Sequence, residues 1–278
     1  MYISVDVGGT KTRVMGSKDF ENFLDPIIYN TPIDPQERLE VLVSQIKEVS
    51  SGEKILGIAV GIPGSISRDG GMIYKTPHLH GWNNYNLRDD LAQMLGAPVF
   101  IENDTAFVGL GEATRGAGKE HDLVVYITVS TGIGGVRIID RKIAPHNNGF
   151  EPGHHIIDWE SDDGVIYAED YLSGSGLLKK YNVQPQDIDD KHVWDDWEKK
   201  MAIFLNNIAV TMDPDTIILG GGLIVKNTNT SVERISKMFA SYLRIYDRPP
   251  LLKKAELGDI GGAYGGFEYL RQRLGNDR

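Results

Sequence analysis

Short hydrophobic runs followed by glycines recur along this chain. Residues 1–6, 123–129 and 216–219 are rich in Val, Ile and other strand-favouring residues, and residues 55–62 form a further apolar run. Runs of this length, bounded by turn-forming residues, predict buried strands. The residues that end them are Gly8-Gly9, Gly132-Ile133-Gly134-Gly135, Gly220-Gly221-Gly222 and Pro63-Gly64. Each strand is therefore expected to lead directly into a tight turn.

Other segments place hydrophobic residues at helical spacing. Leucines four residues apart follow Asn86, a residue that caps helices well, and predict a short helix up to Leu95. Longer patterns predict helices over residues 193–212, 232–243 and 262–274. Alternating strands and helices indicate an α/β protein with more than one sheet.

A predicted strand over residues 99–102 runs into a predicted helix over residues 105–114. Asn103 and Asp104 lie at the join. Ligands favour the carboxyl ends of strands in α/β sheets, so these side chains are well placed for chemistry. Asp104 is a candidate general base, and Asn103 offers a donor and an acceptor for vicinal hydroxyls. The alternative interpretation is that Asp104 only caps the following helix.

The first glycine turn joins two strands into a hairpin whose tip suits phosphate. Gly8 and Gly9 would let backbone N–H groups approach an anion closely, while Thr10, Lys11 and Thr12 add hydroxyls and a cation. Asp6, at the end of the first strand, could hold Mg²⁺ directly or through its water shell. An ordinary hairpin is the alternative. The same device recurs at Thr131, Gly132 and Gly134 behind the strand over residues 123–129.

Composition narrows the possible functions. The chain has 278 residues, 41% of them hydrophobic, which is enough for two modest domains. A net charge of −10 argues against nucleic acid as the main partner. No apolar run approaches the length of a membrane helix, and the first residues read as a strand rather than a signal peptide. We therefore expect a cytoplasmic protein, without a membrane or nucleic-acid partner. The absence of cysteine excludes thiolate catalysis and cysteine metal sites.

Two phosphate hairpins and a later glycine turn resemble the actin, hexokinase and Hsp70 nucleotide-binding superfamily. In detail, the chain resembles the ROK family of sugar kinases and repressors. The motifs that carry the resemblance are Asp6-Val-Gly-Gly-Thr-Lys-Thr12, Gly61-Ile-Pro-Gly64, Glu102-Asn-Asp104, Thr131-Gly-Ile-Gly-Gly135, Glu151-Pro-Gly-His154 and Gly220-Gly-Gly222. The first motif begins at Asp6, ahead of which the family's repressors carry a DNA-binding domain, so a kinase is favoured. The motifs run in the family order over nearly the whole chain.

The resemblance implies two ribonuclease H-like (actin-like ATPase) domains with the active site in the cleft between them. We expect a small domain over residues 1–106 plus 265–278 and a larger domain over residues 107–264. We also expect a homodimer.

The resemblance further implies an ATP-dependent hexose kinase that uses Mg²⁺, with Asp104 as its base. The glucose 6-hydroxyl is the favoured acceptor; an N-acetylhexosamine or another hexose is the alternative, and a non-catalytic sensor a second. The implied sugar ligands are Gly64, Asn103, Asp104, Glu151, His154 and Glu169. The implied ATP ligands are both hairpins and the adenosine turn at Gly220, Gly221 and Gly222.

One departure from the family concerns zinc. Most members hold zinc with the Glu-x-Gly-His histidine and three cysteines, and this chain has none. A mixed site made by His154, His155 and the carboxylates at residues 158–163 is conceivable, but a solvated acidic loop is favoured. We expect Trp159, Ile156, Ile157, Val165 and Ile166 to order the loop as a small apolar cluster instead.

Overall fold

The computed structural model describes residues 1–67, 69–147, 149–158, 160 and 164–275, which form two compact units. Unit 1 comprises Met1–Arg115, Pro145–Gly149 and Asp259–Arg278, and unit 2 comprises Gly116–Ala144 and Phe150–Gly258. The domain limits expected at residues 106 and 265 would each cut through a helix. The units instead divide at residues 115 and 259, because both of those helices belong wholly to unit 1.

Unit 1 is built on a five-stranded sheet in the order β3-β2-β1-β4-β7. Its strands are β1 (Tyr2–Val7), β2 (Lys11–Ser17), β3 (Ile27–Asn30), β4 (Gly57–Ile62) and β7 (Val99–Asn103). Strand β2 is antiparallel to its neighbours β1 and β3, whereas β1, β4 and β7 are parallel to one another. The carboxyl ends of β1, β4 and β7 therefore meet at one edge of the sheet.

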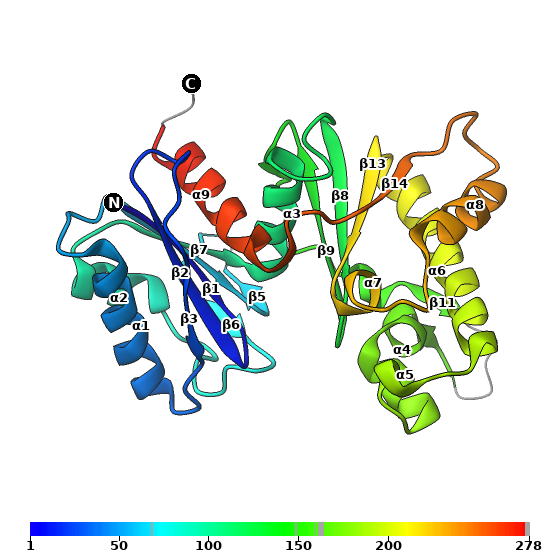
Figure 1. Cartoon of the computed structure of the whole chain (residues 1–278), viewed down its shortest axis with the longest axis horizontal. Coiled ribbons are helices and arrows are strands. Elements are labelled where there is room, and N and C mark those ends of the chain that lie inside the picture. Colours follow the sequence, from blue (N-terminus) through cyan, green and yellow to red (C-terminus); the bar gives the residue numbers. More distant parts are fainter. Residues whose placement is uncertain (68, 148, 159, 161–163, 276–278) are drawn as a thin grey trace. The chain divides into compact units, whose positions relative to one another are not determined.

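Helices cover both faces of this sheet (Figure 1). On one face lie α1 (Pro35–Ser50) and α2 (Leu87–Leu95), whose apolar residues form a continuous core with Ile3, Val5 and Val7 of β1. On the other lie α3 (Asp104–Thr114) and α9 (Gly261–Arg273). Asn86 caps α2 as predicted, through its side chain and the Asp89 N–H. The whole of α1 lay outside the predicted elements.

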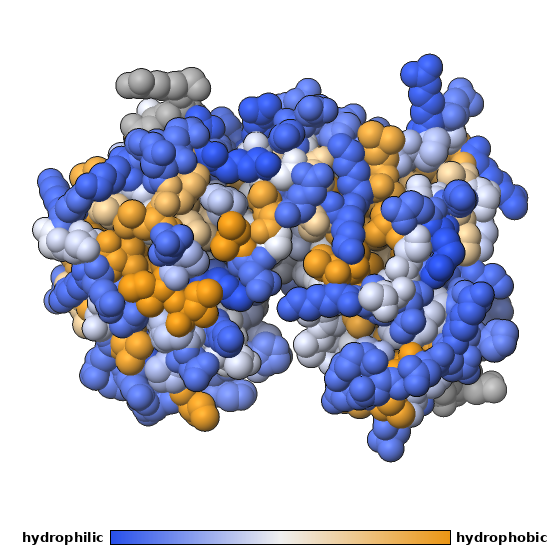
Figure 2. All heavy atoms as spheres, viewed as in Figure 1, coloured by the Kyte–Doolittle hydropathy of each residue, from blue (hydrophilic) through white to orange (hydrophobic). Residues whose placement is uncertain are grey.

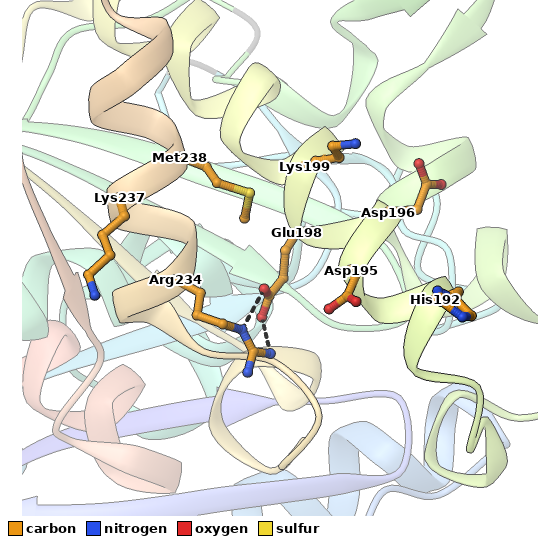
Figure 3. A pocket seen from close by; sticks show the side chains of 8 residues that line it. All are labelled: His192, Asp195, Asp196, Glu198, Lys199, Arg234, Lys237 and Met238. Carbon is orange, nitrogen blue, oxygen red and sulfur yellow. Dashed lines mark hydrogen bonds and ion pairs between the residues drawn. The ribbon is translucent and has the colours of Figure 1, made fainter.

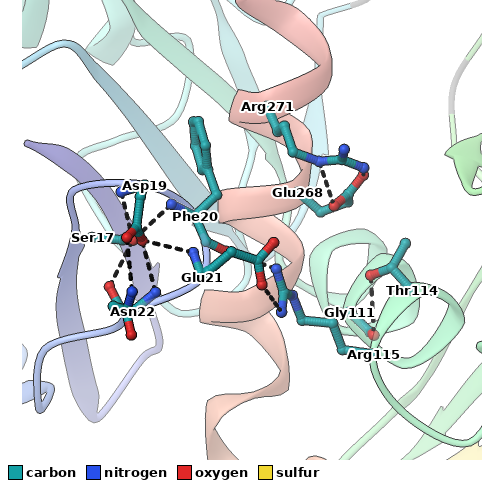
Figure 4. A network of polar contacts seen from close by, with 10 residues as sticks. All are labelled: Ser17, Asp19, Phe20, Glu21, Asn22, Gly111, Thr114, Arg115, Glu268 and Arg271. Carbon is teal, nitrogen blue, oxygen red and sulfur yellow. Dashed lines mark hydrogen bonds and ion pairs between the residues drawn. The ribbon is translucent and has the colours of Figure 1, made fainter. Parts of the chain in front are cut away.

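Glycines let α3 and α9 cross closely. A Cβ added at Gly265 would lie 1.7 Å from the Phe107 carbonyl oxygen, and one at Gly111 would lie 2.4 Å from the Gly261 oxygen. Beyond the end of α3, Arg115 donates a 2.7 Å hydrogen bond to the Phe20 carbonyl and pairs with Glu21 at 3.5 Å (Figure 4). These contacts fasten α3 to the rest of unit 1.

Unit 2 repeats the strand order of unit 1. Its sheet runs β10-β9-β8-β13-β14, with the same sequence of antiparallel and parallel neighbours. The strands are β8 (Leu123–Val129), β9 (Ile133–Ile139), β10 (Lys142–Ile143), β13 (Thr216–Gly220) and β14 (Leu251–Lys254). The two glycine hairpins, β1–β2 and β8–β9, therefore occupy equivalent places in the two sheets.

The helices of unit 2 surround a core centred on α6 (Lys191–Met212). Trp194, Trp197 and Phe204 of this helix are fully buried beside apolar residues of β8 and β13, as the predicted core helix requires. Figure 1 shows α6 beside α8 (Val232–Tyr242). The remaining helices are α4 (Ala168–Leu172), α5 (Gly174–Tyr181) and α7 (Gly222–Val225). The three-residue helical turns are Pro152–His154, Pro185–Asp187 and Gly258–Ile260.

Two short ladders complete the described structure: β5 (Ser65–Ile66) with β6 (Ile73–Lys75), and β11 (Ile156–Asp158) with β12 (Ile166–Tyr167). The second occupies the loop in which an apolar cluster was predicted. That prediction is wrong for Ile156 and Val165, which are 47% and 49% exposed. Of the described members, Ile157 packs against the unit 2 core. Trp159 lies outside the described residues. The β11–β12 backbone pairing connects the two described parts of this segment.

Hydrophilic side chains dominate the face shown in Figure 2, with apolar ones in small groups among them. Exposed large apolar residues include Ile33 and Ile245. In the described part of the chain, no helix combines the length and apolarity needed to cross a membrane.

Candidate active site

Two aspartates meet at the carboxyl edge of the unit 1 sheet. Asp6 of β1 pairs in register with Gly61 of the adjacent β4. Because Gly61 has no side chain, the Asp104 Cα can lie only 3.4 Å from where a Cβ would be. The first residue of α3, Asp104, therefore packs on Gly61, the residue that pairs with Asp6. On its other side Asp6 approaches the first turn of α9, where a Cβ at Gly262 would lie 3.6 Å from the Asp6 carboxyl carbon.

Burial raises the pKa of both carboxylates, and repulsion between negative charges adds to the rise for Asp6. Loss of solvent raises the pKa of Asp6 from 3.8 to about 6, and the charges of Asp104 and Asp259 add to the rise, while Arg13 opposes it. Burial also raises the pKa of Asp104, against hydrogen bonds from Thr105. Raised pKa values of paired carboxyl groups are typical of functional sites, because negative charge is held there without full compensation.

The cap of α3 is Asn103, not Asp104. The Asn103 side chain accepts from the Ala106 N–H at 3.1 Å and donates to the Gly64 carbonyl at 3.1 Å. The Asp104 Oδ1 accepts from the Thr105 N–H at 2.7 Å, and its Oδ2 makes no hydrogen bond with the described residues. The cap interpretation of Asp104 is therefore not supported, and one carboxylate oxygen remains for a substrate.

Gly64 and Glu102 both hydrogen-bond to Asn103, and each has a further feature of its own. At Gly64 the backbone has φ +112°, and a Cβ would lie 2.1 Å from the Lys75 carbonyl oxygen, so only glycine fits. The Glu102 carboxylate accepts from the Asn103 N–H at 2.8 Å. Burial raises the pKa of Glu102, and Arg273 lies close enough to oppose that rise. Glu102 thus faces α9.

The first hairpin presents its tip to solvent, as a phosphate-binding turn must. Gly9, Thr10 and Lys11 are exposed, and the Gly8 N–H closes the turn on the Lys11 carbonyl at 3.0 Å. Thr12 differs, because it is buried and its hydroxyl lies 2.9 Å from the Thr31 hydroxyl. The structure therefore favours a supporting role for Thr12 rather than the phosphate contact expected from sequence.

Sequence reasoning missed two unit 1 residues near these aspartates. Arg13 lies opposite Asp6 in the hairpin register and contacts it at 3.4 Å, and contacts Asp259 at 3.6 Å. The cross-strand pairing of a two-strand hairpin could have revealed Arg13. Asp259 comes from a distant segment, and no local signal marks it. His78 belongs to a stretch, residues 78–84, that the sequence reasoning expected to influence only which sugar is bound.

In unit 2, Glu169 of α4 contacts both the second hairpin and the turn at Gly153. Its Oε2 accepts from the Ile133 N–H at 2.7 Å and lies 2.9 Å from where a Cβ at Gly132 would be. The exposed Thr131 accepts from the Ser175 N–H at 3.0 Å through its carbonyl. Gly134 pairs with Thr128 in the β8–β9 ladder. The hairpin tip and Glu169 therefore form one connected structure.

Glu151 precedes the helical turn Pro152–His154, which His154 ends, and the charges of His154 and Glu169 both act on Glu151. Burial raises the pKa of Glu151, and the negative charge of Glu169 adds to the rise, while His154 opposes it. The His154 ring lies 5.7 Å from the Tyr167 ring, between centroids. The three residues expected to bind sugar in this segment are thus brought together within unit 2.

The third glycine cluster adjoins the second hairpin. Gly221 has φ +85°, and a Cβ there would lie 2.4 Å from the Val129 carbonyl oxygen. A Cβ at Gly220 would lie 2.3 Å from the Tyr126 hydroxyl, and Gly222 starts α7. The turn therefore needs glycine for close packing against β8.

The sequence raised two metal sites, a mixed His and carboxylate site in place of the family's zinc site and a magnesium site at Asp6, and the structure supports them unequally. Among the described residues, no group of three or more His, Asp or Glu side chains is arranged to hold a metal ion; Asp162 and Asp163 lie outside them. Magnesium fits Asp6, because the carboxylates of Asp6, Asp104 and Asp259 gather here. Arg13 opposes the charge of Asp6 and His78 that of Asp104, and a hard cation with carboxylate ligands would relieve the remaining excess.

A separate hollow of about 560 Å³ lies in unit 2. It is lined by residues of α6 and α8 (Figure 3). The Glu198 carboxylate, 2% exposed, accepts from Arg234 at 2.8 and 2.7 Å and from the Ser231 N–H at 2.7 Å. None of the predicted site residues lines this hollow, and its buried carboxylate, Glu198, is already paired with Arg234.

Comparison with known proteins places this geometry in a family. A model of the ROK family matches residues 2–273. The chain belongs to the ROK family. It is 28% identical over 258 residues to a protein named glucokinase from Thermotoga maritima, covering 80% of this chain and 81% of the other. It is 27% identical to an N-acetyl-D-glucosamine kinase from Histophilus somni, covering 95% and 97%.

A ROK structure shares the fold. The crystal structure of a ROK family glucokinase from Streptomyces griseus, in complex with glucose and AMPPNP, superposes with a TM-score of 0.78 at 23% identity. The alignment covers 98% of this chain and 99% of that one. This likeness confirms the predicted α/β fold of the actin-like ATPase type. The assignment of individual site residues stays a prediction.

Proposed function

We propose that this ROK protein is an ATP-dependent hexose kinase with Asp104 as its general base. The observation that carries the proposal is the position of Asp104: a half-buried carboxyl at a strand end, with Oδ2 uncommitted, beside Asp6 and the first phosphate hairpin. Aspartate in this position can accept the proton of an alcohol that attacks phosphorus.

The proposed step transfers the γ-phosphoryl group to a sugar hydroxyl. The hydroxyl proton moves to the Asp104 carboxylate as the sugar oxygen forms a bond to the γ-phosphorus. The bond from that phosphorus to the β,γ-bridging oxygen breaks, and ADP leaves with the bonding electrons. The raised pKa of Asp104 favours proton acceptance, provided that the group is ionised before the step.

Positioning and charge would supply the rest of the catalysis, as is usual for phosphoryl transfer. The N–H groups at Gly8 and Gly9 and the side chains of Thr10 and Lys11 would hold phosphate oxygens. In unit 2, the Thr131–Gly134 hairpin and the Gly220–Gly222 turn would hold the nucleotide. Asp6 would hold Mg²⁺, which neutralises phosphate charge when bound.

The sugar is proposed to be glucose, phosphorylated at its 6-hydroxyl. Asn103 would contribute one remaining N–H and one lone pair, since its other groups bind Gly64 and Ala106. Glu151, His154 and Glu169 would accept or donate to further hydroxyls. A glucokinase and an N-acetyl-D-glucosamine kinase among the relatives support a sugar kinase, with an N-acetylhexosamine as the alternative substrate.

A sugar panel tests the proposal. Purified protein with Mg-ATP is assayed for ADP release with glucose, mannose, allose, fructose and the N-acetylhexosamines. Glucose is expected to give the highest kcat/KM; faster turnover of an N-acetylhexosamine would replace glucose, and no ADP with any sugar would overturn the kinase proposal.

Asp104→Asn is expected to lower kcat by about 10² to 10⁴, the range for a positioned base, with a smaller loss of sugar affinity. The exposed Asp25→Asn is the matched control. Activity of Asp104→Asn near that of the control would remove Asp104 from its role.

A further inference from the structure

The loop over residues 76–83 of unit 1 is held firmly against α1. Leu79 and Trp82 are fully buried, and the Trp82 Nε1 donates to the Pro35 carbonyl at 3.3 Å. Arg38 lies over the Trp82 ring at 4.8 Å and donates to the His80 carbonyl at 3.2 Å. Side chains on this loop are therefore carried by a fixed backbone.

The loop places His78 against the tip of the first hairpin. A Cβ built at Gly9 would lie 2.6 Å from the His78 Cβ, 3.2 Å from its Cγ and 3.7 Å from its Cδ2. The imidazole thus lies alongside the backbone of the phosphate-binding tip. It is also close enough to Asp104 for its charge to lower the pKa of that carboxyl. One side chain therefore adjoins both the hairpin tip and the proposed base.

Packing does not account for this position. His78 is exposed and makes no hydrogen bond with the described residues. The buried neighbour Leu79 anchors the loop, and His80 beyond it is exposed as well. Two exposed histidines thus flank one anchor, and only His78 lies against Gly9.

We propose that His78 binds the phosphoryl group that is transferred from ATP, through an N–H of its ring. The inference rests on the proposed kinase function, in which the group between the hairpin amides and the base is the γ-phosphoryl group. An imidazole N–H is a directional donor, and donors aimed at oxygens of the transferring group stabilise phosphoryl transfer. Lys11 at the same tip would act as a mobile point charge instead.

Nucleotide binding tests His78 without requiring turnover. Calorimetry with Mg²⁺ compares AMP-PNP, which has a γ-phosphoryl group, with ADP, which lacks one. We expect His78→Ala to weaken AMP-PNP binding about tenfold, as for one hydrogen bond to a charged group, and to leave ADP binding within twofold. His78→Gln, which keeps an N–H donor, should recover part of the loss, and His80→Ala should match wild type.

Equal weakening of ADP and AMP-PNP, or no effect on either, would overturn the role of His78. Turnover gives a second readout: kcat of His78→Ala should fall at least tenfold while KM for the sugar changes less than twofold. Failure of the kinase proposal is a different result, in which wild type turns over no sugar. Selective loss of AMP-PNP affinity in His78→Ala would support the phosphoryl contact even then.

Discussion

Asp6→Asn is expected to make this protein more stable at neutral pH while impairing its use of Mg-ATP. The pKa of the Asp6 carboxyl is raised to about 6 in the folded protein, whereas 3.8 is its ordinary value. The folded state therefore binds this proton more tightly than the unfolded state. Ionised Asp6 destabilises the fold above pH 6, and this cost disappears as the pH falls through 6 towards 4. An amide carries no such cost.

The expected gain in the free energy of unfolding follows from the size of the Asp6 pKa shift. The step from 3.8 to about 6 corresponds to about 3 kcal/mol. Two features reduce it: the first turn of α9 favours negative charge by about 0.3–1 kcal/mol, and Arg13 loses its charged partner but keeps Asp259 at 3.6 Å. The Asp6 side chain also keeps 22% of its surface exposed. We expect a net gain of about 1–2 kcal/mol at pH 7.5.

Urea denaturation at pH 7.5 and pH 4.5, in EDTA and without nucleotide, measures this gain. Asp6→Asn should exceed wild type at pH 7.5, and most of the difference should vanish at pH 4.5. The exposed Asp25→Asn should show neither effect. An Asp6→Asn variant less stable than wild type at pH 7.5 would refute the reasoning, because it would mean that ionised Asp6 stabilises the fold.

Three further outcomes are expected. Arg234→Ala should lower the free energy of unfolding by about 2 kcal/mol, because it leaves the buried Glu198 carboxylate without its cation. Adding Glu198→Gln to Arg234→Ala should restore part of this loss. Urea denaturation in which the losses of the two single variants simply add in the double variant would contradict this. Gly265→Ala should cost about 3 kcal/mol or more, since its Cβ would meet the Phe107 carbonyl, whereas Gly262→Ala on the same helix should not; equal melting temperatures would contradict this. Elemental analysis should find no stoichiometric zinc, and activity should survive a zinc-selective chelator once magnesium is restored; one zinc per chain, lost together with activity, would contradict this.

Single strands and helices were predictable because hydrophobic spacing and turn or cap residues determine them within a few neighbouring positions. The strand predicted over residues 123–129 has those bounds in the structure, and Asn86 caps its helix. Helix α1 carries local signals of the same kind, since Asp34 caps it and Pro35 occupies its first turn. The repeated hairpins pointed correctly to a repeated fold.

The approach of Asp104 to Asp6 was beyond local reasoning. It depends on β4 lying between β1 and β7, and on Gly61 leaving room for the start of α3. Strand order is a long-range property that no short pattern encodes. The position of His78 depends likewise on buried Trp82 and Leu79 anchoring a distant loop. Motif order predicted the chemistry that we propose for the site, and packing decides which side chains meet there.

The placement of α9 has a consequence for how this protein is made. Residues 259–273 complete unit 1, yet the ribosome synthesises them only after all of unit 2. At about 5–20 residues per second, roughly 7 to 30 s separate Arg115 from Asp259. Through that interval one face of the first sheet and the glycine face of α3 lack their partner. The nascent chain therefore finishes its second half before its first, and until then it presents an apolar surface to molecular chaperones.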